Sequence, residues 1–139
     1  MTTRLQRLPA YYSYYTRPVK FLATPDGGMA AWKMSWETGG WEPADELVNE
    51  IIGAVGGEIS PIDKDRFIDL TEDNRAELLR GEGPVYALYE TVNALMRDAR
   101  ESGRAPTDEE KALVKGIRRR TYAMFEAELA RRGDPAADV

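Results

Sequence analysis

A turn between two extended runs is the feature that most constrains the fold of this chain. Pro25-Asp26-Gly27-Gly28 combines a proline, which fixes φ, with glycines that accept positive φ. The run after the turn alternates, with Lys33, Ser35 and Glu37 on one side and Ala30, Trp32, Met34 and Trp36 on the other. We therefore predict a β-hairpin over residues 17–37 with one buried face, and we expect Trp32 and Trp36 to lie in the core.

Three later segments have the spacing of amphipathic helices, over residues 43–56, 84–102 and 107–132. Thr107 and Glu110 form a capping-box pattern at the start of the last one. We expect the last two segments to pack as an antiparallel helical hairpin. The longer helix then overhangs its partner by about 10 Å at 1.5 Å per residue. The sheet or a second copy of the chain must cover the apolar residues of this overhang, which are Met124, Phe125 and Leu129.

The other segments carry weaker patterns. Residues 1–16 form an aromatic arm without regular period, and residues 58–81 an acidic linker with a short helix, in which 66–70 is an alternative third strand. Residues 134–139 are expected to be a frayed tail. The predicted fold class is α+β, in a single domain. An N-terminal antiparallel β-hairpin, or a three-stranded sheet, packs against about four α-helices and ends in the long C-terminal helical hairpin.

The amino-acid composition excludes several classes of catalytic and metal site. The 139 residues include no cysteine and no histidine, so Ser-His-Asp and Cys-His catalysis and a conventional zinc site are excluded. The chain has no nucleotide-binding glycine motif, and we expect no cofactor. No secretory signal or apolar run of membrane-spanning length is present, so we expect a cytoplasmic protein. The excess of Arg over Lys and the abundance of Ala suggest a high-GC bacterium.

Carboxylates leave one catalytic route open. Asp63, Asp65 and Asp69 would share one face of a strand if residues 66–70 were extended, and Mg²⁺ prefers oxygen ligands. These three residues are the alternative metal site of a Mg²⁺-dependent enzyme that acts on phosphate substrates. The interpretation that we favour is a solvated acidic loop that caps a helix.

A basic stripe on the last helix offers a nucleic-acid alternative. It consists of Lys111, Lys115, Arg118 and Arg119, with Tyr122 nearby to stack on a base. Acidic residues flank the stripe, and the chain has a net charge of −5, unlike most nucleic-acid binders. We therefore favour an ordinary solvated helix face, and we expect neither nucleic acid nor a membrane as a partner.

Aromatic residues are the strongest candidates for recognition, because large rings bury much area at low entropy cost. The acid-free start of the chain, with Arg4, Arg7, Arg17 and Lys20, would attract an acidic partner. The competing interpretation is that the arm folds back and packs its rings on the hairpin. The predicted partner or ligand contacts are Tyr11, Tyr12, Tyr14, Tyr15, Trp41 and Phe125.

These patterns together predict a non-enzymatic interaction or accessory protein, of the inhibitor or immunity type. Its partner would be another protein, and the chain would form a homodimer. The first alternative is a small-ligand binding module with a pocket lined by Trp32, Trp36, Trp41 and the tyrosines. The second alternative is the Mg²⁺-dependent enzyme, and the third is the nucleic-acid binder.

Overall fold

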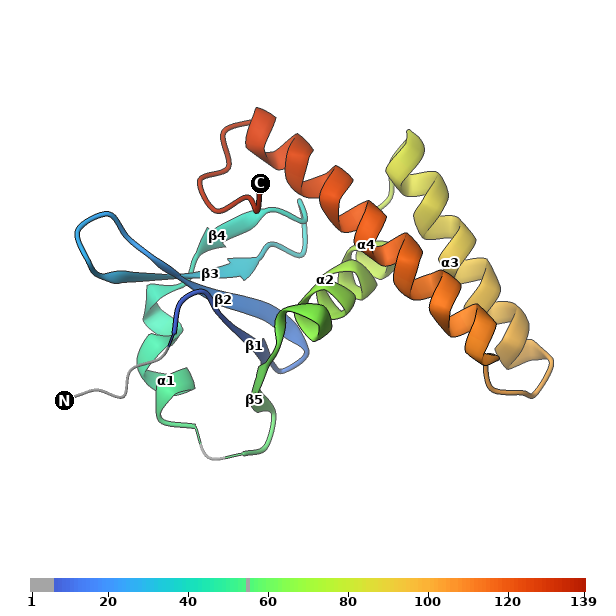
Figure 1. The fold of residues 1–139 in the computed structure, drawn as a ribbon, viewed down its shortest axis with the longest axis horizontal. Coiled ribbons are helices and arrows are strands. Elements are labelled where there is room, and N and C mark those ends of the chain that lie inside the picture. The colour runs from blue at the N-terminus through green and yellow to red at the C-terminus, as the bar shows by residue number, and fades with distance from the viewer. Residues whose placement is uncertain (1–6, 55) are drawn as a thin grey trace.

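The computed structural model describes residues 7–54 and 56–139. Its centre is a five-stranded antiparallel sheet with the strand order β4-β3-β2-β1-β5 (Figure 1). The strands are β1 (Ala10–Tyr14), β2 (Arg17–Ala23), β3 (Met29–Met34), β4 (Trp41–Pro43) and β5 (Ile59–Ile62). Strands β2 and β3 are the predicted hairpin. The Thr24 amide donates to the Gly28 carbonyl at 3.0 Å, and Gly27 has a φ of +86°. The turn residues therefore act as the sequence predicts.

The sheet is larger than predicted, because the aromatic arm contributes a strand to it. Residues 10–14 form β1, which pairs with β2 on one side and with β5 on the other. The residues expected to form a third strand, 66–70, lie in a helix instead, and Ser60 and Pro61 belong to β5. A strand covered on both faces does not alternate between apolar and polar residues, which explains why β1 had no recognisable period.

Both faces of the sheet are covered, so the prediction of one buried face is wrong. On the face toward helices α2 and α4, Met34, Trp41 and Phe67 form one cluster. On the opposite face a second cluster packs under the turn η1 (Asp45–Leu47) and the short helix α1 (Val48–Ile52). Ala31 belongs to this second cluster and is 1% exposed, although its neighbour Trp32 points to the first.

Three longer helices follow the sheet: α2 (Lys64–Leu78), α3 (Pro84–Glu101) and α4 (Asp108–Arg131). The α3–α4 hairpin and the capping box of Thr107 and Glu110 are confirmed. The predicted helix over 43–56 is reduced to residues 48–52, because β4 and η1 use the residues before it. The predicted linker over 58–81 holds β5 and the 15-residue helix α2.

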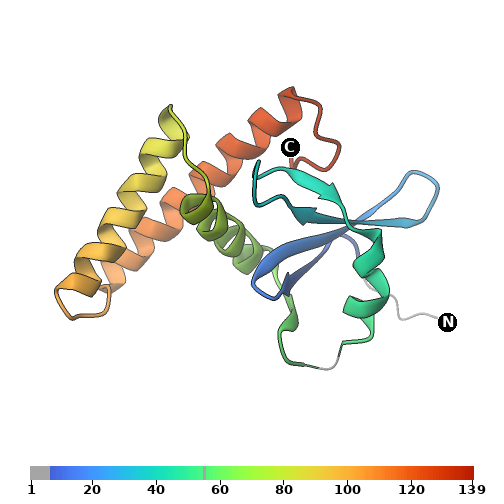
Figure 2. The same ribbon diagram turned by 180° about the vertical axis from the view of Figure 1, so that it is seen from behind.

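The sheet and the chain end supply the cover that the overhanging part of α4 needs. Phe125 and Leu129 are buried under the β3–β4 loop, where a Cβ on Gly39 would lie 2.8 Å from the Phe125 ring. The other half of α4 and all of α3 extend away from the sheet (Figure 2). The second chain that the sequence suggested as cover is not required.

The C-terminal residues fold back onto the sheet, so the prediction of a frayed tail is wrong. Ala136 is 1% exposed, and its carbonyl accepts a hydrogen bond from Lys20 Nζ at 2.6 Å. The Asp134 carboxylate accepts from the backbone amide of Trp41 at 2.9 Å, which occupies an edge donor of β4. These polar contacts within the protein offset the entropy lost by ordering the tail.

Candidate functional site

The structure separates the six predicted contact residues into two groups. Tyr12, Trp41 and Phe125 are core residues with exposures of 5%, 6% and 9%, and Tyr11 is half-buried with its ring 4.5 Å from that of Phe67. These rings pack inside the protein, as the competing interpretation of the arm predicted for the tyrosines. Tyr14 and Tyr15 reach the surface, where Tyr15 is 52% exposed.

Tyr14 and Tyr15 belong to a surface cluster at one end of the sheet. Their rings meet edge to face at 4.9 Å, and Tyr14 pairs with Arg17 across β1 and β2. The guanidinium of Arg17 lies 4.5 Å from the centre of the Trp36 ring. Trp36 is 50% exposed, so its predicted place in the core is wrong. We call Tyr14, Tyr15, Arg17 and Trp36 the aromatic edge.

The backbone holds the aromatic edge in place. Arg17 Nε donates to the Met34 carbonyl at 2.8 Å, and Arg17 Nη2 lies 3.2 Å from Glu42 Oε1. These two contacts fix the guanidinium at an orientation in which it packs on Trp36. An arginine that is already ordered loses little additional entropy when a partner binds against it.

The turn that presents Tyr15 is strained. Tyr15 and Thr16 have φ values of 50° and 65°, in the left-handed region that hairpin turns usually fill with Asn and Gly. A β-branched residue such as Thr16 rarely adopts this conformation. The Tyr15 amide donates to the Glu58 carbonyl at 2.9 Å, and the Asn74 side chain donates to the Thr16 carbonyl at 3.1 Å. The surrounding structure therefore holds two costly residues at a position that displays an aromatic ring.

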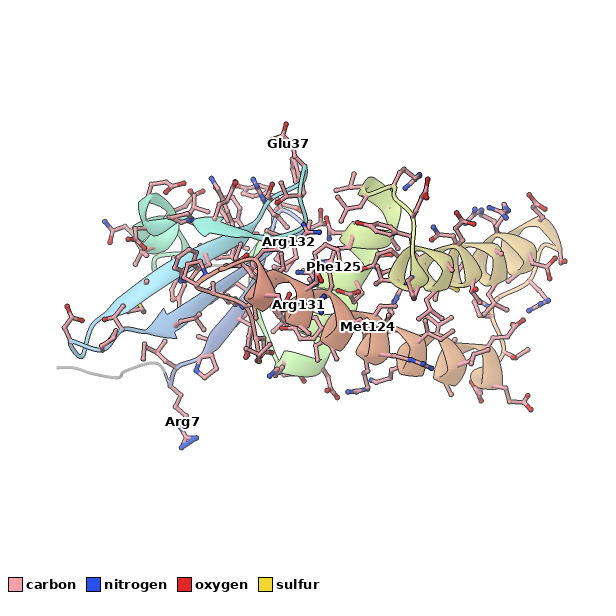
Figure 3. The ribbon with its side chains drawn as sticks, turned by 90° about the horizontal axis from the view of Figure 1, so that it is seen from above. Arg7, Glu37, Met124, Phe125, Arg131 and Arg132 are labelled. Atoms are coloured by element: carbon pink, nitrogen blue, oxygen red, sulfur yellow. The ribbon has the colours of Figure 1, made fainter. Side chains whose placement is uncertain are left out.

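Acidic side chains surround the aromatic edge. The Tyr14 hydroxyl donates to Glu50 at 2.9 Å, which raises the pKa of Tyr14. Lys33 pairs with Glu46 at 3.1 Å, and Arg17 pairs with Glu42. Glu37, the residue after Trp36 in the chain, projects outward (Figure 3). Four carboxylates thus stand against two cations, and the surface attracts basic groups.

This distribution corrects the expectation of a basic arm that attracts an acidic partner. Arg17 is engaged by Glu42, and Lys20 is 2% exposed inside the protein. Arg7 is exposed and points away from the body of the molecule (Figure 3), while Arg4 lies outside the described residues.

A buried ionic cluster lies between the sheet and the helices, and sequence reasoning missed it. It consists of Lys20, Glu72, Arg75 and Glu126, all at most 2% exposed. Arg75 donates to Glu72, to Glu126 and to the Gly39 carbonyl, and the Trp41 indole donates to Glu126 at 3.0 Å. The sequence contained one signal: Glu126 occupies the apolar stripe of α4 together with Tyr122 and Leu129 at helical spacing.

Lys20 has altered acid–base chemistry but no access to a substrate. Burial lowers its pKa from 10.5 to about 8, although Glu126 and Asp138 act against that change. Its ammonium group donates to the Ala136 carbonyl and lies 4.2 Å from the centre of the Trp41 ring. A lysine with a lowered pKa can act as a nucleophile, but Lys20 is closed off from solvent. Its contacts instead tie the tail to the sheet.

The predicted metal-binding carboxylates have other roles. Asp63 is the N-cap of α2 and accepts from the Arg66 amide at 2.8 Å, while Asp65 pairs with Arg119 at 3.1 Å. Because residues 64–78 form a helix, Asp63, Asp65 and Asp69 do not share the strand face on which the prediction depended. Within the described ranges, 7–54 and 56–139, no group of three or more acidic side chains is arranged to hold a metal ion.

The predicted nucleic-acid stripe is divided by the packing of α4 on α2. Arg118 pairs with Asp73 at 3.3 Å and Arg119 pairs with Asp65, so both arginines connect the two helices. Tyr122 is buried and donates its hydroxyl to Asp138, so it is closed to a base. Lys111 and Lys115 remain exposed.

Comparisons of the chain with protein family models, with curated proteins and with solved structures found no match. In the part of the chain that the structure describes, no helix has both the length and the apolar character needed to cross a membrane. The residues themselves therefore carry the functional argument.

Proposed function

We propose that this chain is a non-enzymatic accessory protein that binds another protein through the aromatic edge. The observation that carries the proposal is the pair formed by Arg17 and Trp36: a half-exposed tryptophan packed against an arginine that the backbone already holds. Trp, Tyr and Arg are the residues most enriched at the energetic centres of protein interfaces. An ordered arrangement of all three favours binding over simple solvation.

The chemistry of the partner follows from the charge around the edge. Glu37, Glu42, Glu46 and Glu50 lie around the rings. A partner that presents arginine or lysine side chains would pair with these carboxylates and pack apolar stems on Trp36 and Tyr15. We therefore propose a basic protein surface as the partner, in an inhibitor- or immunity-type relationship. We place it in the cytoplasm of a high-GC bacterium, as the composition suggests.

Self-association is a weaker form of the same proposal. The homodimer was expected because the overhang of α4 needed cover, and the sheet and the tail bury Phe125 and Leu129 without a second chain. The proposal therefore favours a different protein, and a homodimer is one outcome of its test.

Site-specific photocrosslinking in the source cell tests this proposal. A photoreactive amino acid at position 15 should give one dominant crosslink to a basic protein, and Trp36→Ala should weaken that crosslink at least tenfold. The same amino acid at position 113 is the matched control, because Leu113 is 52% exposed on α4, outside the aromatic edge. A crosslink from position 15 to a second copy of the chain would show that the aromatic edge forms a homodimer and does not bind a different protein. Equal products from positions 15 and 113 would refute the proposal.

A further inference from the structure

A groove runs along α2 and α3, separate from the aromatic edge. Its first part is a cleft of about 580 Å³ between the end of α2, the link after it and residues 86–97 of α3. A second cleft of about 400 Å³ shares Arg80, Asn93 and Arg97 with the first and continues to Arg100 and Arg118. The two clefts therefore form one continuous surface, of a size typical for small-molecule sites.

The groove concentrates positive charge in an acidic protein. Arg80, Arg97, Arg100 and Arg118 line the two clefts against three carboxylates, Asp73, Glu77 and Glu90, which is a local excess of one positive charge in a chain of net charge −5. A cluster of like charges destabilises a fold unless an oppositely charged group is bound there.

The arginines of the groove differ in how they are engaged. Arg118 pairs with Asp73, and Arg80 Nη1 donates to the carbonyls of Glu77 and Leu79 at 2.9 and 2.8 Å, so both are fixed. Arg97 and Arg100 are exposed and three residues apart on α3, and their side chains form no hydrogen bond or ion pair with any described residue. Two free guanidinium groups beside two fixed ones can bind a phosphate with parallel N–H donors.

The other end of the groove has an aromatic wall. The Tyr86 ring lies against Gly81, where a Cβ would be only 2.7 Å from Tyr86 Cε2, and meets Tyr89 edge to face at 5.8 Å. These contacts hold the ring at the cleft wall. Asn93 donates its amide to the Ala76 carbonyl at 3.3 Å, which leaves its side-chain oxygen as an acceptor between the ring and the arginines.

We propose that this groove binds a phosphorylated small molecule that carries an aromatic ring, the chemical class of the nucleotides. The ring would pack on Tyr86, and the phosphates would lie between Arg80, Arg97 and Arg100. An aromatic wall and unpaired guanidinium groups lie within one groove, and such a ligand needs both. It does not depend on the aromatic edge, so either proposal can fail without the other.

Calorimetric titration of the full chain with ADP, pyrophosphate and adenosine at low salt tests the proposal. ADP should bind, and pyrophosphate and adenosine should each bind at least tenfold more weakly. Arg97→Gln and Arg100→Gln should each weaken ADP binding about tenfold. Arg132→Gln should leave it unchanged, because Arg132 is an exposed arginine just after the end of α4 that pairs with Glu128.

Folding of the variants gives a second readout. Removing Arg97 or Arg100 takes away an unpaired like charge, so the free energy of unfolding should stay the same or rise, which a structural role would not produce. The proposal is overturned if ADP does not bind, or if Arg97→Gln binds it as well as the native chain. If pyrophosphate binds as tightly as ADP, the aromatic ring does not contribute to binding, and the proposed contact with Tyr86 is wrong. A single-stranded oligonucleotide that binds more tightly through the same arginines would replace it with a nucleic-acid site.

Discussion

Arg75 and Glu126 form an ion pair of 2.5 Å in which neither side chain is exposed to solvent. The guanidinium also pairs with Glu72 at 2.8 Å and lies 4.1 Å from the centre of the Phe125 ring. One arginine thus pairs with a carboxylate from α2 and a carboxylate from α4 at the point where both helices meet the sheet. Among the described residues, only the Thr71 hydroxyl is a buried side-chain polar group without a hydrogen bond. Thr71 does not belong to the cluster, so every buried side-chain polar atom of the cluster has a hydrogen-bond partner.

Breaking this pair should be much more costly than breaking an exposed one. Arg75→Met leaves Glu72 and Glu126 buried without their cation, and we expect the free energy of unfolding to fall by about 3–5 kcal/mol. Arg118→Met removes the partially exposed pair with Asp73 and should cost less than about 1 kcal/mol. Urea unfolding of both variants measures the difference. Equal losses would show that the buried cluster does not stabilise the fold in the way that its geometry indicates.

Lys20 should make the protein more stable as the pH rises from 7 to 9.5. Its pKa is lowered to about 8 in the folded protein and stands at 10.5 in the unfolded chain, so between these values the unfolded state binds more protons. The expected gain is about 2 kcal/mol over that range. Above pH 10 the unfolded tyrosines ionise, and burial raises the pKa of Tyr89 and Tyr122, so stability should fall again.

Substitution isolates the contribution of this lysine. Lys20→Met should abolish the rise in unfolding free energy between pH 7 and 9.5, and Lys111→Met, at an exposed position, should retain it. The test is urea unfolding at half-unit pH intervals. A rise that persists in Lys20→Met would assign it to another group.

The folded tail should be required for full stability. Deleting residues 134–139 removes the Ala136 carbonyl from Lys20 and the Asp138 amide from Glu126. Each loss takes one hydrogen bond from a buried charged group, although Glu126 keeps its bonds to Arg75 and Trp41, so we expect a decrease of about 3 kcal/mol. Deleting Val139 alone, which is 86% exposed, should change the stability by less than about 0.5 kcal/mol. Thermal and urea unfolding of the two truncations give the comparison, and equal stability would show that the tail contributes nothing.

Substitutions in the strained β1–β2 turn should change the stability of the fold and the binding of the partner independently. Thr16→Gly removes a left-handed β-branched residue and should stabilise the fold by about 1 kcal/mol or more while retaining Tyr15. Tyr15→Asn combined with Thr16→Gly should be at least as stable, but it lacks the exposed ring. We expect only the double variant to lose the partner captured through the aromatic edge. Unfolding measurements give the first effect, and comparison of the partner bound by each variant gives the second. A destabilised Thr16→Gly would show that the turn is not strained.

Local chemistry made the hairpin and the last two helices predictable. The turn at residues 25–28 and the capping box at Thr107 depend only on neighbouring residues, and the structure contains both. Helix α2 resembled a linker because its buried side carries Glu72 and Arg75, which only a partner on another helix can satisfy. Trp36 was placed in the core because the alternation continues past Met34, the last paired residue of β3.

Arg17 and Lys20 show what the sequence determined by itself and what the tertiary structure decided. Both belong to the acid-free start of the chain and lie on one strand, and the sequence identified that strand from the turn that follows it. Their odd separation places them on opposite faces of the sheet. The pairing of Lys20 with Tyr11 and Trp32 then directs it toward the helices, where the carbonyl of Ala136 accepts a hydrogen bond from its ammonium group. Arg17 stays at the surface against Trp36. Side-chain alternation is local, but the groups that cover each face come from distant parts of the chain, so only the folded structure assigns one cation to the core and the other to recognition.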